Sequence, residues 1–378
     1  MAHTIEELIP EYIRGLPVYI PGRPIEEVER ELKIHAIKLA SNENPLGPSP
    51  KAVEAVRNSV GESNRYPDGG THLLRAKLAR QHGVAMDQIF MALGSSEIID
   101  LASRILLAPG KTGVTSHGSY APFSLAIRAS GAELVRVPQR DFAFDLRAIA
   151  DAILAHRQTR IVYLANPNNP TGTAFGAAEL REFLQRVPSD VLVVLDEAYI
   201  HYADRADMPD SVQLFREHKN LLTLRTFSKA YGLAGLRVGY GIGDTPVLEA
   251  MNKLRTPFNL AGVSQAAALA ALDDIEHVNR SVNENAIERA RLTKGLAELG
   301  LRPVRSHSNF IFIDIGPDVQ DLCNDLLHQG VIVRPLGWMG FPEAMRVSVG
   351  IAPENSKLLD VMPRILAKRE GKSEVASR

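Results

Sequence analysis

Residues 161–199 read IVYLANPNNPTGTAFGAAELREFLQRVPSDVLVVLDEAY. Residues 161–165 and 191–195 are short apolar runs rich in β-branched side chains, which is typical of strands buried on both faces of a sheet. Residues 178–186, between the two runs, carry a helical pattern of apolar side chains. A buried strand, a helix and a second buried strand in succession predict neighbouring parallel strands of an α/β sheet.

The same alternation continues on both sides of this stretch. Further buried strands are predicted at residues 89–93, 113–115, 134–137 and 221–224. Helices are predicted at residues 96–107, 122–130, 146–155 and 212–218. Because strands and helices alternate, we expect a mostly parallel central sheet that is flanked by helices.

The pattern changes after Pro257. Helices are predicted at residues 264–272, 275–299, 319–327 and 354–367, and strands at residues 310–315, 331–334 and 345–349. We therefore expect a large domain over residues 41–265 and a smaller α+β domain over residues 266–378, whose last residues, 368–378, fray into solvent. Residues 1–40 are rich in Gly and Pro and are expected to form an N-terminal arm that joins the small domain or a dimer contact.

The composition excludes several classes of protein. The chain has 378 residues, of which 45% are hydrophobic and 23% charged, and a net charge of -1, which is ordinary for a globular enzyme and favours neither nucleic acid nor an anionic membrane surface. No apolar run approaches the ~20 residues that span a bilayer, so a cytoplasmic location is expected. The single cysteine, Cys323, rules out an intrachain disulfide, and the histidines show no metal-ligand spacing, so we expect no metal.

A lysine lies in the segment Thr226-Phe227-Ser228-Lys229, eight residues before Arg237. A lysine amine can act as a covalent catalyst by forming a Schiff base with a carbonyl, and pyridoxal phosphate (PLP) is the most familiar such partner. The phosphate of PLP requires hydroxyl groups and a cation, which this segment supplies. The alternative is a surface lysine after a short strand.

Two polar segments follow predicted strands. Asp196 comes directly after residues 191–195, and the carboxyl ends of strands form the ligand crevice of an open α/β sheet. A carboxylate there could keep a pyridine nitrogen protonated, or it could only cap a turn. Asn169 lies in the loop of residues 166–172, where two X-Pro bonds favour a rigid shape and a cis bond is possible. Its amide could donate to a phenolic oxygen, or the loop could be an ordinary turn.

Anion-binding groups are predicted at two further places. Gly94, Ser95 and Ser96 join the strand at residues 89–93 to a helix, and free N–H groups at a helix N-terminus bind anions. Arg334 and Arg346 lie in apolar strands, so each points outward into water or inward to an anionic partner. Residues 239–243, GYGIG, lack the spacing of a dinucleotide-binding loop.

Taken in order, these features resemble the fold-type I PLP-dependent aminotransferases over nearly the whole chain. The match rests on Tyr66, Gly94-Ser95-Ser96, Tyr120, Asn169-Pro170-Thr171-Gly172, Asp196-Glu197-Ala198-Tyr199, Ser228-Lys229, Arg237 and Arg346. Within that superfamily, residues 18–22, 39–50 and 65–69 resemble the histidinol-phosphate aminotransferases most closely.

The resemblance implies a role for each of these residues. Lys229 would form the Schiff base with PLP and shuttle the proton, and Asp196 would pair with the pyridine nitrogen. Tyr199 and Asn169 would bind the phenolic oxygen. Tyr120 and Ala198 would pack on the two faces of the ring. The phosphate would be held by Gly94, Ser95, Ser96, Thr226, Ser228 and Arg237, and by Tyr66 from the second subunit of a dimer. The substrate would be bound by Tyr19, Asn169, Arg334 and Arg346.

The resemblance also implies a reaction. An amino group would pass from histidinol phosphate to 2-oxoglutarate, giving imidazole-acetol phosphate and glutamate in histidine biosynthesis, in a homodimer with shared active sites. Three alternatives stay open on the same scaffold: an aromatic amino-acid aminotransferase, a PLP-dependent decarboxylase of the threonine-phosphate type, and a ligand-sensing module.

Overall fold

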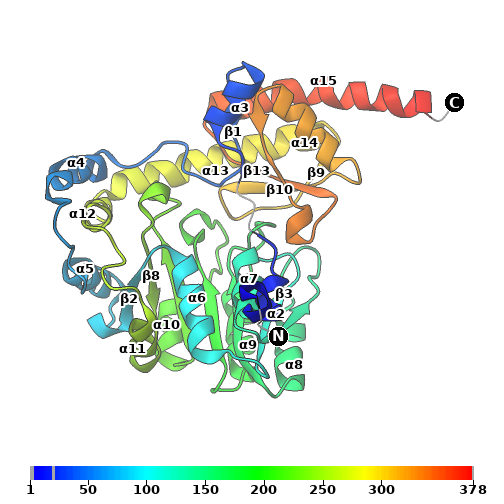
Figure 1. Ribbon diagram of the computed structural model, residues 1–378. Helices are drawn as coiled ribbons and strands as arrows, with labels where there is room; N and C mark the ends of the chain where they lie inside the picture. The colour runs from blue at the N-terminus through cyan, green and yellow to red at the C-terminus, as the bar shows by residue number, and fades with distance from the viewer. Residues whose placement is uncertain (1–3, 19–21, 377–378) are drawn as a thin grey trace.

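A computed structural model describes residues 4–18 and 22–376 of the protein. Within these residues, seven strands form the larger sheet in the order β2-β8-β7-β6-β5-β3-β4 (Figure 1). Its strands are β2 (Ile89–Ala92), β3 (Thr112–Ser116), β4 (Glu133–Val137), β5 (Thr159–Ala165), β6 (Leu192–Asp196), β7 (Leu221–Thr226) and β8 (Gly239–Ile242).

The predicted pair of parallel strands lies at the centre of this sheet. β5 and β6 pair in parallel, with Ala165 opposite Asp196, and β6 pairs in parallel with β7, with Asp196 opposite Leu224. Parallel pairing brings the carboxyl ends of all three strands to one edge of the sheet. The segments that carry Asn169, Asp196 and Lys229 therefore leave the sheet side by side.

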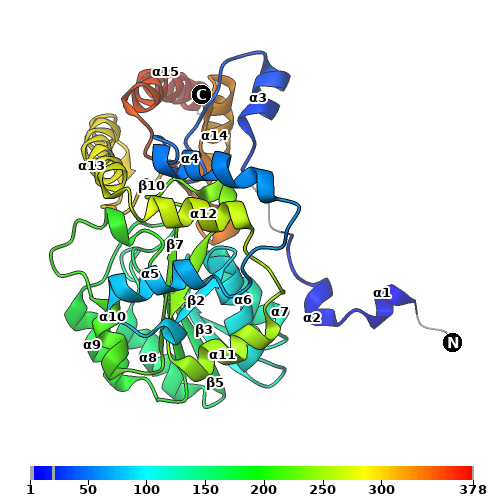
Figure 2. The ribbon, with the colours of Figure 1, turned by 90° about the vertical axis from the view of Figure 1, so that its left-hand side faces the viewer.

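Helices cover both faces of the larger sheet. In Figure 2, α8, α9 and α10 lie on one side of the strands, and α6 and α7 lie on the other. The helices of the large domain are α4 (Pro50–Ser59), α5 (His72–His82), α6 (Ser95–Leu106), α7 (Ala121–Ala129), α8 (Leu146–Ala155), α9 (Ala177–Arg186), α10 (Ser211–Glu217), α11 (Thr245–Leu254) and α12 (Gly262–Ala271). Short 3-10 helices are η1 (Val60–Glu62), η2 (Met86–Gln88), η3 (Ile200–Tyr202), η4 (Ala234–Leu236) and η5 (Gly337–Met339).

Strand β8 was not predicted. Its residues are the glycine-rich GYGIG segment, and the strand lies antiparallel between β2 and β7. A Cβ atom at Gly239 would approach the backbone of Gly94 to 2.6 Å, so the absence of a side chain lets β8 pass against the turn that follows β2. Helices α4, α5 and α11 were also not predicted.

The smaller sheet is antiparallel, and among the described residues it has four strands in the order β12-β13-β10-β9. Its strands are β9 (Arg302–Pro303), β10 (Phe310–Asp314), β12 (Arg334–Pro335) and β13 (Ala344–Ser348), and its helices are α13 (Ile275–Glu298), α14 (Val319–His328) and α15 (Ala352–Ala376). The strand predicted at residues 331–334 divides into β11 (Val331–Ile332) and β12, which belong to different sheets. The end predicted to fray is helical as far as Ala376.

The N-terminal segment contacts both domains. Helix α3 (Ile25–Leu32) and strand β1 (Ile37–Lys38) pack on the small domain, where β1 pairs in parallel with β11. Helices α1 (Ile5–Leu8) and α2 (Glu11–Arg14) extend from the body of the molecule in Figure 2. The Arg128 side chain in α7 donates to the carbonyl of Gly15, just after α2, at 2.9 Å.

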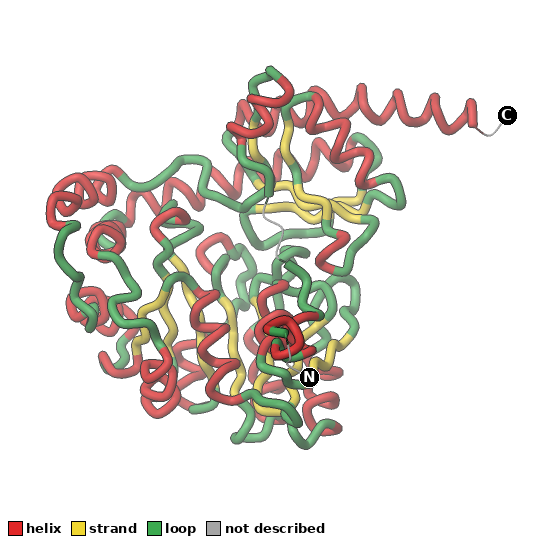
Figure 3. The backbone as a smooth tube through the Cα atoms, in the orientation of Figure 1, coloured by secondary structure: helices red, strands yellow, loops and turns green. Residues whose placement is uncertain are grey.

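Two large clusters of buried apolar side chains correspond to the two sheets. The larger one surrounds the seven-stranded sheet and includes Ala267 and Ala271 of α12, so the predicted domain boundary at residue 265 falls inside a helix of the large core. The smaller one lies between α13, α14, α15 and the antiparallel strands. Helix α13 runs between the two bodies (Figure 3). No helix of the described chain is both long and apolar enough to span a bilayer.

Candidate active site

A pocket lies at the carboxyl edge of the parallel strands, below the small antiparallel sheet. Its lining from the large domain comprises Ser95, Ser96, Tyr120, Ala165, Pro167, Asn169, Asp196, Ala198, Tyr199, Thr226, Ser228, Lys229 and Arg237. Its lining from the rest of the chain comprises Gly22, Ala40, Ser41, Asn42, Arg334, Trp338, Met339 and Arg346. Most of the side chains that the sequence proposed separately therefore meet in one cavity.

Asp196 is the last residue of β6, and its side chain is buried in the wall of the pocket, with 4% of the residue exposed. Burial raises the pKa of its carboxyl from 3.8 to about 6, although the backbone N–H of Ala198, at 2.9 Å, and the hydroxyl of Ser95 both stabilise the ionised form. An ionised carboxylate in this position is incompletely compensated. It is therefore suited to a cationic or protonated nitrogen of a ligand.

Lys229 lies in the loop after β7 and faces the same pocket. Its Nζ donates to the carbonyl oxygens of Asn42 at 3.2 Å and of Ser41 at 3.5 Å. Burial, reinforced by the charge of Arg346, lowers the pKa of the amine to about 8. Near that pH, about half of the molecules carry a neutral amine, which is the form that attacks a carbonyl or accepts a proton.

An anion-binding cradle lies at the start of α6. Gly94 adopts φ +79°, and a Cβ atom there would come within 2.7 Å of Arg237 Nη2, so glycine lets the guanidinium approach the helix N-terminus. The Thr226 hydroxyl donates to Ser228 Oγ at 2.9 Å, and Arg237 Nη1 donates to the same Ser228 oxygen at 3.4 Å. Two hydroxyls, a guanidinium and the first N–H groups of a helix are a donor set that fits a phosphate.

Aromatic groups flank the pocket on two sides. The Tyr120 hydroxyl lies 3.2 Å from Ser96 Oγ, at the mouth of the anion cradle. The Tyr199 hydroxyl accepts a hydrogen bond from Asn42 Nδ2 at 3.0 Å, and burial raises the pKa of this phenol. The Tyr199 ring packs edge-on against Phe310 of β10, with ring centroids 5.0 Å apart.

The small domain contributes two buried arginines. Arg334 on β12 lies directly opposite Arg346 on β13, so both side chains leave the sheet on the same face. Arg346 Nη1 donates to Asn169 Oδ1 at 2.5 Å, and its Nη2 donates to the Ala40 carbonyl at 2.7 Å. The Arg334 guanidinium stacks on the Trp338 ring at 4.8 Å. The strands thus point these arginines inward, and two cations in one pocket favour an anionic substrate.

The family described as aminotransferase class I and II matches residues 34–361. The chain belongs to this family. It is 45% identical over 359 residues to histidinol-phosphate aminotransferase 2 of Pseudomonas fluorescens, covering 94% of this chain and 96% of that protein. It is 46% identical over 358 residues to histidinol-phosphate aminotransferase 2 of Pseudomonas aeruginosa, covering 94% and 96%.

A solved structure agrees with this assignment. The histidinol-phosphate aminotransferase of Sinorhizobium meliloti, in complex with pyridoxal-5'-phosphate, superimposes with a TM-score of 0.88 at 31% identity and covers 95% of this chain and 97% of that chain. The predicted fold-type I architecture and the predicted resemblance to histidinol-phosphate aminotransferases are confirmed. The aminotransferase is therefore an enzyme of this class, while the roles given to individual residues stay predictions.

Among the residues that the structure describes, two of the predicted ones do not line the pocket. Gly94 lies just behind it, where it shapes the anion cradle. Tyr66 has 83% of its surface exposed and stacks on Phe258, with ring centroids 4.7 Å apart. Tyr19 lies outside the described residues.

Asn42 is a pocket residue for which no role was predicted. It is buried in the left-handed conformation, with φ 56°. Its Oδ1 accepts from the Ser348 hydroxyl at 2.9 Å, and its Nδ2 donates to Tyr199, so one side chain joins the two domains. Only the fold shows which side chains Asn42 meets, because Tyr199 and Ser348 lie far from it in the sequence.

We expect Asn42→Ala to lower the free energy of unfolding by about 3 kcal/mol, since two buried hydrogen bonds and a left-handed backbone are affected. Asn42→Gly is the matched control, because glycine adopts φ 56° without strain. It should lose only the hydrogen bonds and be about 1 kcal/mol more stable than the alanine variant. Urea unfolding measures both values, and equal stability of the two variants would contradict the strain contribution.

Asp196→Asn should change how the stability of the ligand-free protein depends on pH. The folded pKa of about 6 lies above the unfolded value, so wild type loses stability as pH rises from about 4 to 6 and stays less stable above it. At pH 8, the asparagine variant should be more stable than wild type by about 3 kcal/mol, with little difference near pH 4. Urea unfolding across this range tests this, with the exposed Asp321→Asn as control. A difference in unfolding free energy between variant and wild type that does not vary with pH would contradict this prediction.

Proposed function

We propose that the aminotransferase uses PLP to transfer the amino group of histidinol phosphate to 2-oxoglutarate, giving imidazole-acetol phosphate and glutamate in histidine biosynthesis. The observation that carries the chemistry is that Lys229, the Asp196 carboxylate and an anion cradle line one pocket. The identity of 45% over nearly the full length of a histidinol-phosphate aminotransferase supports the substrate.

The donor set of the pocket fits PLP at each end. Gly94, Ser95, Thr226, Ser228 and Arg237 supply the N–H groups, hydroxyls and cation that a phosphate requires. Asp196 supplies a buried carboxylate for the ring nitrogen, and Lys229 supplies an amine for the aldehyde. The PLP bound to the S. meliloti relative supports the same assignment.

When bound, PLP supplies an aldehyde to which amines attach and a ring that accepts the electron pair released when a Cα–H bond breaks. Asp196 favours the protonated, electron-poor ring, because its own ionised form is poorly compensated in the wall of the pocket. Asn169 and Tyr199 present donors from the segments that follow β5 and β6. The side-chain oxygen of Asn169, Oδ1, already accepts a hydrogen bond from Arg346. The side-chain nitrogen, Nδ2, is therefore the atom that can donate to a ligand oxygen.

Lys229 Nζ is the group that moves the proton. With its pKa lowered to about 8, the amine can take a proton from the Cα atom of the substrate. It can then deliver that proton to the carbon of the former aldehyde group without leaving the pocket. The carbonyls of Ser41 and Asn42 hold the ammonium form between these two transfers. Because all these groups are held in place, the transfer is effectively unimolecular.

Arg334 and Arg346 bind the anionic end of each substrate. Histidinol phosphate carries a phosphate and no α-carboxylate, whereas 2-oxoglutarate carries carboxylates. A guanidinium can clamp either group with two parallel hydrogen bonds, so one pair of arginines serves both half-reactions.

A half-reaction screen tests the proposed substrate. The PLP-loaded enzyme is mixed with histidinol phosphate, phenylalanine, tyrosine or threonine phosphate, and conversion of the cofactor to pyridoxamine phosphate is followed by absorbance. We expect histidinol phosphate to react with a kcat/KM at least about tenfold above the aromatic amino acids, a difference of about 1.4 kcal/mol. Lys229→Ala is the control and should not convert the cofactor with any amine.

Faster reaction of phenylalanine or tyrosine would replace the proposed substrate with an aromatic amino acid. Release of carbon dioxide from threonine phosphate, without a need for a 2-oxo acid, would instead indicate a decarboxylase. Specific binding without turnover of any amine would indicate a sensing module.

We also infer that the enzyme is a cytoplasmic homodimer with shared active sites. Tyr66 is predicted to contact the cofactor phosphate, yet its side chain is exposed and stacks on the exposed Phe258. Both facts are compatible if Tyr66 reaches the pocket of a second subunit. The N-terminal segment has exposed apolar side chains on α1, on α2 and between them, and these are suited to the same subunit contact: Ile5, Leu8, Ile9, Tyr12 and Ile13.

Subunit mixing tests the shared site. Lys229→Ala and Tyr66→Ala are each expected to be poorly active alone. In a mixed dimer, one pocket combines the intact Lys229 of one subunit with the intact Tyr66 of the other, so activity should exceed the mean of the two parents several-fold. Turnover is measured after denaturing and refolding the mixture, and activity at the parental mean would show that the pocket is complete within one subunit.

A further inference from the structure

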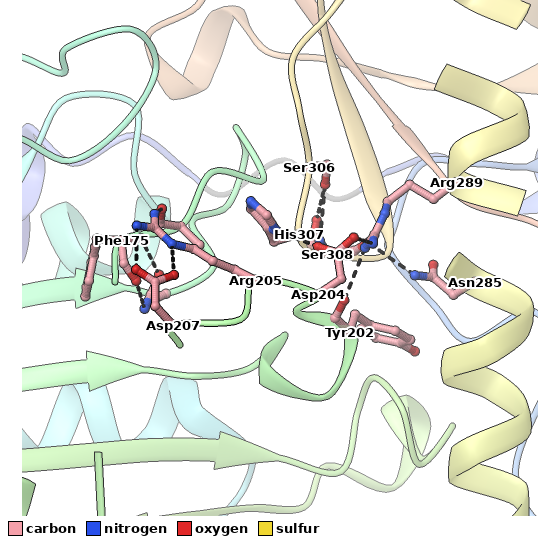
Figure 4. A network of polar contacts seen from close by, with 12 residues as sticks. Phe175, Tyr202, Asp204, Arg205, Asp207, Asn285, Arg289, Ser306, His307 and Ser308 are labelled. Atoms are coloured by element: carbon pink, nitrogen blue, oxygen red, sulfur yellow. Dashed lines mark hydrogen bonds and ion pairs between the residues drawn. The ribbon is translucent and has the colours of Figure 1, made fainter. Parts of the chain in front are cut away.

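A second polar cluster lies outside the pocket, where the two domains meet (Figure 4). Asp204, in the loop after η3, accepts from Arg289 of α13 at 2.7 Å and from His307 Nδ1 at 2.5 Å. Arg289 and His307 are both buried, while about half of the Asp204 side chain is exposed. One carboxylate of the large domain therefore holds two buried basic side chains of the other body.

Backbone groups complete this cluster. Arg289 Nη1 donates to the Ser308 carbonyl at 2.8 Å and to the Tyr202 carbonyl at 3.2 Å. The His307 backbone N–H donates to the Gly172 carbonyl at 2.7 Å. A Cβ atom at Gly172 would lie 2.3 Å from Ser306 Oγ, so glycine allows the loop of residues 166–172 to pack against residues 306–308.

Each segment in the cluster continues into a residue of the pocket. The chain that reaches Asp204 has just passed Asp196 and Tyr199, and the loop that ends at Gly172 carries Asn169. Residues 306–308 lead into β10, which pairs with β13 so that Phe312 lies opposite Arg346. Phe310 packs against both the Tyr199 ring and the Arg346 guanidinium, at 5.0 and 5.2 Å.

We propose that Asp204 is a positioning residue, which through Arg289 and His307 sets the small-domain strand that carries Arg346 against Asn169 and Tyr199. This role rests on the proposed function, because it assigns to Asp204 the placement of the substrate-binding arginine. The Arg346–Asn169 hydrogen bond, at 2.5 Å, joins the same two bodies inside the pocket. A shift of the small domain would therefore change substrate binding before it changed the large-domain residues that hold the cofactor.

The ionic character of the contact suits this role. Burial would raise the pKa of the Asp204 carboxyl, but the hydrogen bond from His307 and the charge of Arg289 hold it below its usual range, so the carboxylate stays ionised near neutral pH. Removing it leaves a buried guanidinium and a buried imidazole without their shared acceptor. Such a change is costly, so the two bodies are expected to adjust their relative position.

The chain offers a matched control on the same loop. Asp207 accepts from Arg205 Nε at 2.5 Å, three residues after Asp204, and this ion pair is exposed. Arg205 also donates to the Ala174 carbonyl, so the pair lies within the large domain (Figure 4). Asp207→Asn removes one carboxylate charge from the same loop. The side-chain hydrogen bonds of Asp207 come from Arg205, and its charge interaction with His307 is the smallest of the effects on its carboxyl.

The experiment compares Asp204→Ala, Asp204→Glu and Asp207→Asn in the PLP-loaded enzyme, well below the unfolding temperature. We expect Asp204→Ala to raise the KM of both the amine donor and 2-oxoglutarate about tenfold, a size typical of misplaced substrate-binding groups. The PLP dissociation constant should stay within about twofold, and Asp204→Glu should recover part of the loss. Asp207→Asn should change none of these values. If Asp204→Ala does not fold, the isosteric Asp204→Asn should give a smaller change in the same direction.

A binding measurement separates this inference from the substrate assignment. Trp338 is the single tryptophan of the chain and stacks on Arg334 in the pocket, so its fluorescence reports inorganic phosphate at the arginines. Asp204→Ala should raise the dissociation constant of inorganic phosphate about tenfold, whichever amine the enzyme uses. The positioning role would be overturned if Asp204→Ala had the same KM values and the same phosphate affinity as wild type. It would also be overturned if Asp207→Asn lost as much substrate and phosphate binding as Asp204→Ala. Failure of histidinol phosphate to react would overturn only the proposed substrate.

Discussion

The parallel pairing of β5, β6 and β7 is the constraint on which the site depends. Parallel strands end at one edge of their sheet, so the register that sets Ala165 beside Asp196 also brings the Asn169 loop and the Lys229 loop to that edge. The sheet itself is apolar and buried, and it carries no catalytic group until its strands end. The chemistry therefore lies in the short connections, while the strands determine where those connections begin.

The small domain completes the pocket at this edge. Its antiparallel strands place two cationic side chains above the parallel sheet, and Arg346 is joined to the loop of residues 166–172 by a hydrogen bond to Asn169. Burying several ionisable groups together is unfavourable unless a ligand completes their interactions. The pKa values of Asp196 and Lys229 reflect this lack of a ligand partner. Burial raises the pKa of the Asp196 carboxyl and lowers the pKa of the Lys229 amine, so in each group the neutral form is favoured more than it would be in water.

The sequence predicted the strands of the large sheet well, because buried parallel strands are continuous apolar runs that have few other interpretations. It singled out Asp196 because that residue follows such a strand directly, and Lys229 because hydroxyl side chains and Arg237 lie close to it in the sequence. It missed β8, whose glycines are needed for close approach to Gly94 and weaken any strand pattern. It also gave no role to Asn42, since that role depends on Tyr199 and Ser348, which lie far away in the chain. Long-range polar contacts leave no periodic signal, so they become visible only in the fold.

The two large apolar clusters have a mechanical consequence. The contacts that cross between the two bodies are of two kinds. Some are hydrogen bonds and ion pairs, such as those of Arg289, and others are aromatic contacts, such as Tyr199 with Phe310 and Phe142 with Phe312. A solvent-accessible hydrogen bond between the two bodies can be replaced by hydrogen bonds to water at a small net cost in free energy. Separating apolar side chains instead exposes hydrophobic surface to water, which is unfavourable. Any displacement of the small domain would therefore have to separate these aromatic rings, so the ring contacts, more than the polar ones, determine how firmly the cavity is held closed.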